Sequence, residues 1–168
     1  MNAFALTGND WNDANGPCCG VLACAIATQT KFADAWAWFK DKYNYCKATS
    51  WRGGTFNEWY KGYLDHAGVK YDYLYDLELR HKGWFDKTLI NFARTAAEKD
   101  TAYLISTTGH AQVLYNGNVV DQRGVKPITE YWGKLKKIRN MYVIHGIDKD
   151  NIDNLVFGLP LFDAANKQ

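Results

Sequence analysis

The chain has 168 residues and a formal net charge of +2, a length that suits one domain of ordinary size and one that can bury roughly 70% of its unfolded surface. The balanced total charge gives no electrostatic case for nucleic-acid binding, and no apolar run reaches the roughly 18 residues that span a membrane. The first residues lack the basic and long apolar regions of a signal peptide. We therefore expect a cytoplasmic protein with a single domain over residues 1–168, in which 148–168 form a loosely packed arm.

A buried helix is predicted to begin near Pro17 and to end near Gln29. Residues 18–28 carry no charge, and the helix they form is apolar nearly all round, as buried helices are. Proline suits a helix start and would break its interior. Cys18 and Cys19 would then lie in the first turn, where the helix dipole favours a thiolate. A helical cysteine is more often a packing residue, so a nucleophile here needs a base elsewhere in the chain.

The four cysteines are expected to be reduced. An even count can indicate disulfides, but Cys18 and Cys19 are adjacent, and without a secretory signal the reduced state is the default. The sequence has no Cys-x-x-Cys pair and no histidine close to the cysteines, which argues against a structural zinc site. We expect neither a metal nor a cofactor.

Four more elements are predicted before residue 100. Two amphipathic helices follow the buried one, the second opened by a capping box of Thr55 and Glu58. An alternating run rich in tyrosine then indicates a strand, and another amphipathic helix comes after it. The predicted ranges are 32–43, 55–67, 69–77 and 86–98.

The second half of the chain changes to strands. Short apolar or alternating runs are separated by turn residues, and Asn116-Gly117 is a strong hairpin signal. Helices followed by an antiparallel sheet indicate an α+β fold. The predicted strands are Ala102–Thr107, His110–Tyr115, Asn118–Gln122 and Met141–Ile147.

The hairpin register brings a histidine and a carboxylate to one face. If Asn116-Gly117 is a two-residue turn, Tyr115 pairs with Asn118, and counting outward places His110 and Asp121 on the same face as diagonal neighbours. Backbones about 7–8 Å apart allow two polar side chains to hydrogen-bond. A one-residue error in the turn would reverse the faces. A lone histidine at a strand start is more often structural, and His145 is the rival for a base.

Three motifs in matching order resemble the papain-like cysteine peptidase superfamily, and most closely the small papain-like proteins encoded by bacteriophages and bacteria. They are a Cys-Gly-Val-x-Ala-x-Ala-Ile-Ala-Thr helix start at 19–28, a Thr-x-Gly-His-Ala strand at 107–111 and a Gly-x-Val-x-Asp return at 117–121. The resemblance implies a papain-like fold, with N-terminal helices packed on a C-terminal sheet. It implies Cys19 as nucleophile, His110 as base and Asp121 as the orienting residue.

The resemblance leaves the oxyanion donors open. Gly20-Val21 follows Cys19, which makes Cys18 the less suitable thiol, but the family usually has Asn-Asp where this chain has Pro17-Cys18. The expected donors are the backbone N–H of Cys19 and one upstream amide. Asn15 and Asn12 are the candidates, although asparagine is more often a turn residue.

These residues predict a cysteine hydrolase, a peptidase acting on a protein or peptide through an acyl-enzyme, in the host cytoplasm if it is phage-encoded. The same groups could catalyse deamidation or acyl transfer. The alternative is a catalytically silent papain-like module that binds a host or partner protein, and the apolar stretch Leu155–Phe162 would then take part in binding. A third possibility, nucleic-acid binding through the basic run 134–139 beside Tyr131 and Trp132, is weaker because short basic runs are usually solvated faces. The oligomeric state is left open.

Overall fold

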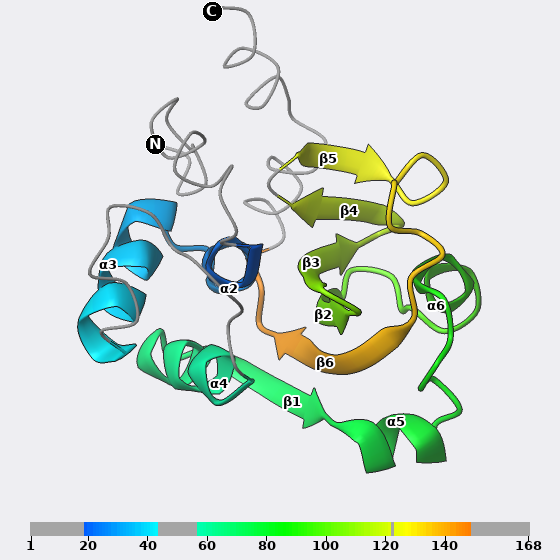
Figure 1. Ribbon diagram of the computed structural model, residues 1–168, viewed down its shortest axis with the longest axis horizontal. Coiled ribbons are helices and arrows are strands. Elements are labelled where there is room, and N and C mark those ends of the chain that lie inside the picture. The colour runs from blue at the N-terminus through cyan, green and yellow to red at the C-terminus, as the bar shows by residue number, and fades with distance from the viewer. Residues whose placement is uncertain (1–18, 44–56, 122, 149–168) are drawn as a thin grey trace, which may run out of the picture.

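The protein has an α+β fold built on one antiparallel sheet. The computed structural model describes residues 19–43, 57–121 and 123–148. Within these ranges six strands follow the order β1-β6-β2-β3-β4-β5, and each neighbouring pair is antiparallel (Figure 1). The strands are β1 Lys70–Leu74, β2 Ala102–Thr107, β3 His110–Tyr115, β4 Asn118–Asp121, β5 Gly124–Pro127 and β6 Ile138–His145, and the helices are α2 Cys19–Thr28, α3 Phe32–Tyr43, α4 Asn57–His66, α5 Asp76–His81 and α6 Leu89–Thr95.

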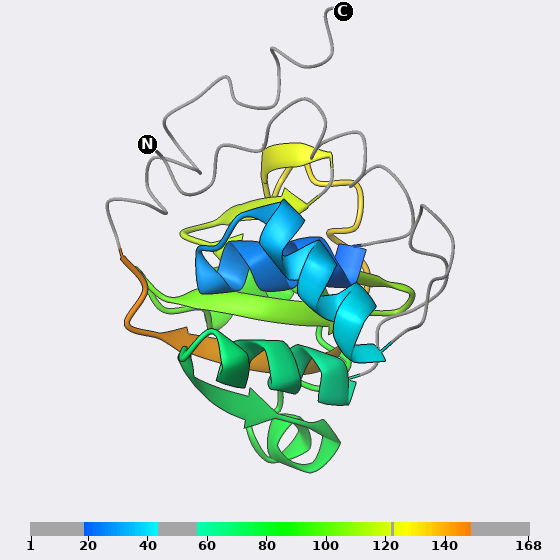
Figure 2. The same ribbon diagram turned by 90° about the vertical axis from the view of Figure 1, so that its left-hand side faces the viewer.

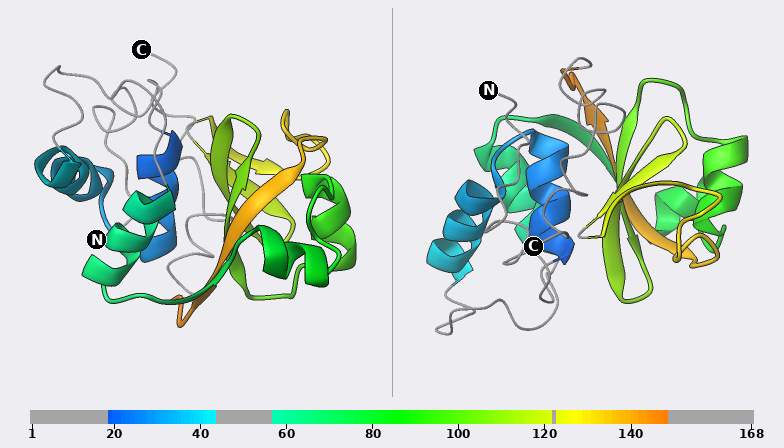
Figure 3. Two further views of the ribbon diagram at one scale, coloured as in Figure 1. Left: turned by 60° about the horizontal axis from the view of Figure 1, so that its bottom comes forward. Right: turned by 90° about the horizontal axis from the view of Figure 1, so that it is seen from above.

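The sheet lies between two layers of helices. Alternate strand residues point to opposite faces, so Leu104 and Tyr142 pack with α2, α3 and α4, whereas Ile105 and Met141 pack with α5 and α6. Figure 3 shows the helices on the two sides of the sheet. The strands are therefore apolar on both faces, and each face contributes to its own hydrophobic cluster.

Helix α2 is the buried helix that the sequence predicts. Every residue from Gly20 to Thr28 is buried, and the helix lies between the sheet and α3, with α4 beside it (Figure 2). It ends where Gln29 takes a positive φ of 59°. The amide of Thr30 then donates to the Ala25 carbonyl at 3.0 Å, which completes a Schellman motif. The uncharged segment thus forms the centre of the hydrophobic cluster on this face of the sheet.

The β3–β4 hairpin has the predicted turn and register. Asn116 and Gly117 both have positive φ, 46° and 76°, as a type I′ turn requires. Tyr115 pairs with Asn118 and Leu114 with Val119. The hairpin prediction is therefore confirmed at the level of the backbone.

Elsewhere the boundaries differ from the prediction. The strand predicted over 69–77 ends at Leu74, because acidic residues in the first turn and basic residues in the last turn of 76–81 suit a short helix, α5. Helix α6 is shorter than 86–98 and begins after Thr88, whose hydroxyl accepts from the Asn91 amide at 3.3 Å. Strand β6 starts earlier, inside the basic run, and β5 was not predicted at all.

Several predictions fall on residues outside the described ranges. These are Pro17 and the start of the buried helix, Thr55 of the capping box, and the arm expected over 148–168, of which only residue 148 is described. None of the helices within the described ranges combines the length and the apolar character that crossing a bilayer requires.

Candidate active site

Cys19 and His110 meet where two elements begin. Cys19 is the first described residue of α2 and His110 the first residue of β3. The half-buried thiol is hydrogen-bonded to the His110 side chain and to the backbone of Ala111. Since helix α2 packs against β3, the two side chains are held together by the same contact that forms the core.

Asp121 holds the other side of the imidazole. His110 Nε2 lies 2.9 Å from Asp121 Oδ2, and the two side chains are 8% and 1% exposed. This is the hydrogen bond that the predicted register allows. Because Nε2 is engaged by the carboxylate, Nδ1 is the ring nitrogen left for Cys19, and the partner on one nitrogen fixes the role of the other.

The carboxylate of Asp121 is fixed by three further donors. The Arg123 amide donates to Oδ1 at 2.7 Å, the Tyr131 hydroxyl to Oδ2 at 2.8 Å, and the Trp132 indole N–H lies 3.4 Å from Oδ2. Burial raises the pKa of Asp121, but the hydrogen bonds from His110, Arg123 and Tyr131 outweigh it and lower the pKa below its usual value. Asp121 is therefore a buried anion whose oxygens are satisfied.

The electrostatics of Cys19 and His110 favour an ion pair. Burial raises the pKa of the Cys19 thiol, but the hydrogen bond to His110 and the charge of its ring bring the net pKa below 9.0. Burial lowers the pKa of His110, whereas its hydrogen bonds to Asp121 and Cys19 raise it to about 9. Each shift favours the charged form, so thiolate and imidazolium stabilise one another.

Tyr131 and Trp132 belong to this site, which the sequence did not indicate. The Trp132 ring lies edge-on to His110, with the centroids 5.1 Å apart. Tyr131 is 2% exposed, and its hydroxyl also lies 3.4 Å from Oε1 of the buried Gln112. In the sequence, the two residues precede a basic run, a pattern that is typical of nucleic-acid-binding surfaces. No local pattern relates these residues to Asp121, because the contact depends on how the chain returns after β5.

A pocket of about 270 Å³ adjoins the thiol and the imidazole. Its walls come from the start of α2, the beginning of α4, the β2–β3 turn and the first residues of β6. An acyl group placed there would contact both Cys19 and His110. The lining residues are Cys19, Asn57, Tyr60, Ser106, Thr107, Gly109, His110, Ala111, Arg139 and Asn140.

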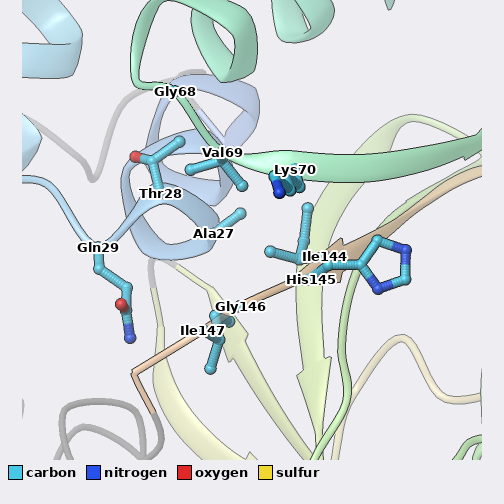
Figure 4. Close-up of a pocket in the computed structure, with 10 residues that line it drawn as sticks. All are labelled: Ala27, Thr28, Gln29, Gly68, Val69, Lys70, Ile144, His145, Gly146 and Ile147. Atoms are coloured by element: carbon cyan, nitrogen blue, oxygen red, sulfur yellow. The ribbon is translucent and has the colours of Figure 1, made fainter.

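His145, the rival base, lies at the other end of α2. It lines a second pocket of about 340 Å³, together with Thr28 and Gln29 at the last turn of the helix (Figure 4). Its Nε2 is 2.8 Å from Asp72 Oδ2, and both side chains are largely exposed. A helix of this length extends roughly 15 Å from Cys19 to Thr28. His145 is therefore not placed to act on Cys19.

The other predicted site residues are outside the described ranges or have a different environment. Asn12, Asn15 and Cys18 fall outside the described residues. Cys24 is completely buried in α2, and burial raises the pKa of its thiol well above the usual value, so it is a packing residue. Within residues 19–43, 57–121 and 123–148, no three His, Cys, Asp or Glu side chains group so that they could hold a metal ion.

Comparison of the chain with protein-family models, with curated proteins and with solved structures finds no match. Any functional inference therefore depends on the geometry of the residues themselves.

Proposed function

We propose that this protein is a cysteine hydrolase, with Cys19 as nucleophile, His110 as general acid and base, and Asp121 as the residue that orients the imidazole. The observation that carries this proposal is the continuous chain of hydrogen bonds from the thiol through the ring to a buried carboxylate. A nucleophile, its base and an orienting group in this sequence are the parts that covalent acyl transfer requires.

The proposed reaction has two halves. The Cys19 thiolate attacks the carbonyl carbon of an amide or thioester, and the imidazolium gives its Nδ1 proton to the leaving group as the acyl-enzyme forms. Water then attacks the acyl-enzyme while His110 accepts a proton from it, and the carboxylic acid leaves from sulfur. Asp121 keeps its charge throughout and stabilises the imidazolium. The Cys19 amide is the proposed first oxyanion donor.

A papain-like arrangement of the α+β fold is part of the same proposal. A thiol at the head of a buried helix, a histidine at the start of a strand and a carboxylate on the neighbouring strand support it. A protein or peptide is the proposed substrate class, and deamidation or acyl transfer would use the same groups.

Alkylation of the native protein tests the proposal. Iodoacetamide at neutral pH should label Cys19 at least about tenfold faster than a free thiol, because a larger share of it is thiolate. Site-resolved mass spectrometry measures this rate, and Cys24 in the same helix provides the internal control of a buried, unreactive thiol. Labelling of Cys19 no faster than a free thiol would contradict the proposal.

Activity requires a second comparison. Peptide mixtures incubated with the wild-type protein should yield products that Cys19→Ala and His110→Ala do not produce, whereas Cys24→Ala should still produce them. If Cys19→Ala retains every measurable property of the wild type, including binding to partner proteins, a non-catalytic binding module is the better description.

A further inference from the structure

Cationic side chains gather around the two-residue turn that precedes His110. Thr108 and Gly109 connect β2 to β3, where Thr107 pairs with His110. Lys136 Nζ donates to the Thr108 carbonyl at 3.2 Å, and Arg139 Nε lies 3.4 Å from the Thr108 hydroxyl oxygen. Both cations come from the chain at and just before β6, so the tertiary fold brings them to the end of the sheet that carries the imidazole.

Arg139 lines the pocket beside the thiol. Its guanidinium pairs with Asp86, and its side chain remains 43% exposed. The ion pair holds the side chain in place, yet leaves its remaining N–H groups available. A guanidinium presents five donors, of which one carboxylate engages at most two in a bidentate pair.

Lys136 and a third cation, Arg123, lie over the ring of Trp132. Lys136 Nζ and Arg123 Cζ are each 4.5 Å from the ring centroid, and the same ring is in contact with His110. Neither Lys136 nor Arg123 forms an ion pair with a carboxylate among the residues that the structure describes. Arg139 on the pocket wall, with Lys136 and Arg123 over the Trp132 ring, thus forms a cationic rim next to His110. Among the residues that the structure describes, only Arg139 of these three has a carboxylate partner.

We infer that this rim selects a substrate with a carboxylate close to the scissile carbonyl, which makes an acidic peptide the substrate class of the proposed hydrolase. The inference rests on the proposed function of the same site. Positive charges in and beside a cleft raise the local concentration of an anionic ligand, and Arg139 lines this pocket while Lys136 and Arg123 lie next to it over Trp132. The carboxylate can belong to an acidic side chain or to a free C-terminus.

Nucleic acid suits this surface less well than an acidic peptide. Binding a strand without sequence preference uses exposed aromatic faces on which bases stack. Trp132 is exposed, but Lys136 and Arg123 lie over its ring, and Tyr131 is buried against Asp121. The aromatic residues therefore support the site and the cations, and they do not form an open stacking platform.

Charge-selective alkylation tests the rim. The rate of Cys19 alkylation by anionic iodoacetate is divided by the rate with neutral iodoacetamide, at low ionic strength and pH 7. Lys136→Gln and Arg123→Gln should each lower this ratio by about twofold, the effect of one unit charge at about 10 Å in water. Lys99→Gln is the matched control and should leave the ratio unchanged, because Lys99 precedes β2 at the end of the β2–β3 pair that is far from His110.

Protection of Cys19 by short peptides tests the substrate class. An amidated, N-acetylated peptide of alanine and glutamate should slow the alkylation more than the same peptide with glutamine. The glutamine peptide with a free C-terminal carboxylate separates the two sources of the anion. Oligouridylate, added at the same concentration of negative charge, tests whether a nucleic acid protects Cys19 better than the acidic peptide does.

The outcomes separate this inference from the proposed function. The inference is overturned if the iodoacetate-to-iodoacetamide ratio is the same in Lys136→Gln and Arg123→Gln as in the control Lys99→Gln. It is also overturned if charged and neutral peptides protect Cys19 equally, or if oligouridylate protects it better than the acidic peptide. Fast but charge-insensitive labelling of Cys19 would leave the hydrolase proposal standing. Slow labelling whose ratio still depends on Lys136 would instead contradict the hydrolase while the rim remained an anion-binding surface.

Discussion

Tyr131 donates a 2.8 Å hydrogen bond to Oδ2 of Asp121, the same oxygen that lies 2.9 Å from His110 Nε2. Asp121 and Tyr131 are 3% and 2% exposed. The tyrosine comes from the loop between β5 and β6, so the carboxylate is fixed by a segment that is not part of its own hairpin. The phenol thereby sets the direction from which the carboxylate faces the imidazole.

Tyr131→Phe should lower both stability and the proposed activity. A buried hydrogen bond to a charged group contributes about 1.5–3 kcal/mol, and its loss leaves Asp121 less firmly placed. Urea unfolding measures the loss. Tyr103→Phe is the matched control, because the Tyr103 hydroxyl accepts from the Glu98 amide at 2.9 Å, away from the site. Equal reactivity of Cys19 in Tyr131→Phe and in the wild type would contradict the supporting role.

Asp121→Asn should change the charge state of the imidazole as well as its position. The hydrogen bond to Asp121 helps to raise the pKa of His110 to about 9, so a neutral amide should lower that pKa. The proposed activity should fall by at least about 10²-fold, and the basic limb of its pH profile should move to lower pH. A lower rate with the basic limb unmoved would mean that Asp121 acts only as a structural residue.

The pH profile of the wild type should be bell-shaped. Activity should rise with pH as the Cys19 thiol, whose pKa is lowered, becomes a thiolate. It should fall again as His110 loses its proton near pH 9, since the leaving group then lacks an acid. The two limbs belong to the coupled pair, not to single residues. Rates of peptide cleavage or acyl-ester hydrolysis across pH 4–11 measure the profile, and a basic limb at pH 6–7 would contradict the ion pair.

Gly117→Ala should destabilise the hairpin that aligns His110 with Asp121. The residue has a φ of 76°, a left-handed conformation that costs a residue with a Cβ roughly 1–2 kcal/mol. Chemical unfolding measures the change. Lys99→Ala, an exposed site near the same end of the hairpin, is the control and should be within about 0.5 kcal/mol of the wild type. A stability equal to the wild type would mean that the turn has relaxed to another type.

The sequence by itself determined the features that depend on neighbouring residues. The uncharged segment 18–28 predicts a buried helix because no face of it suits water. Asn116-Gly117 predicts the turn, and because side chains alternate along a strand, that turn also predicts that His110 and Asp121 share a face. These inferences need only local backbone geometry and burial, and the structure agrees with them.

Tertiary structure decided the rest. Three features join residues that are far apart in the chain. Strand β1 pairs with β6, Tyr131 donates a hydrogen bond to Asp121, and Lys136 and Arg139 lie beside the β2–β3 turn. No local pattern in the sequence specifies such contacts. They form only when helices cover both faces of the sheet and the chain passes back across the end of the sheet. The same long-range packing brings Cys19 to the imidazole, and it is what turns a helix start and a hairpin into a candidate active site.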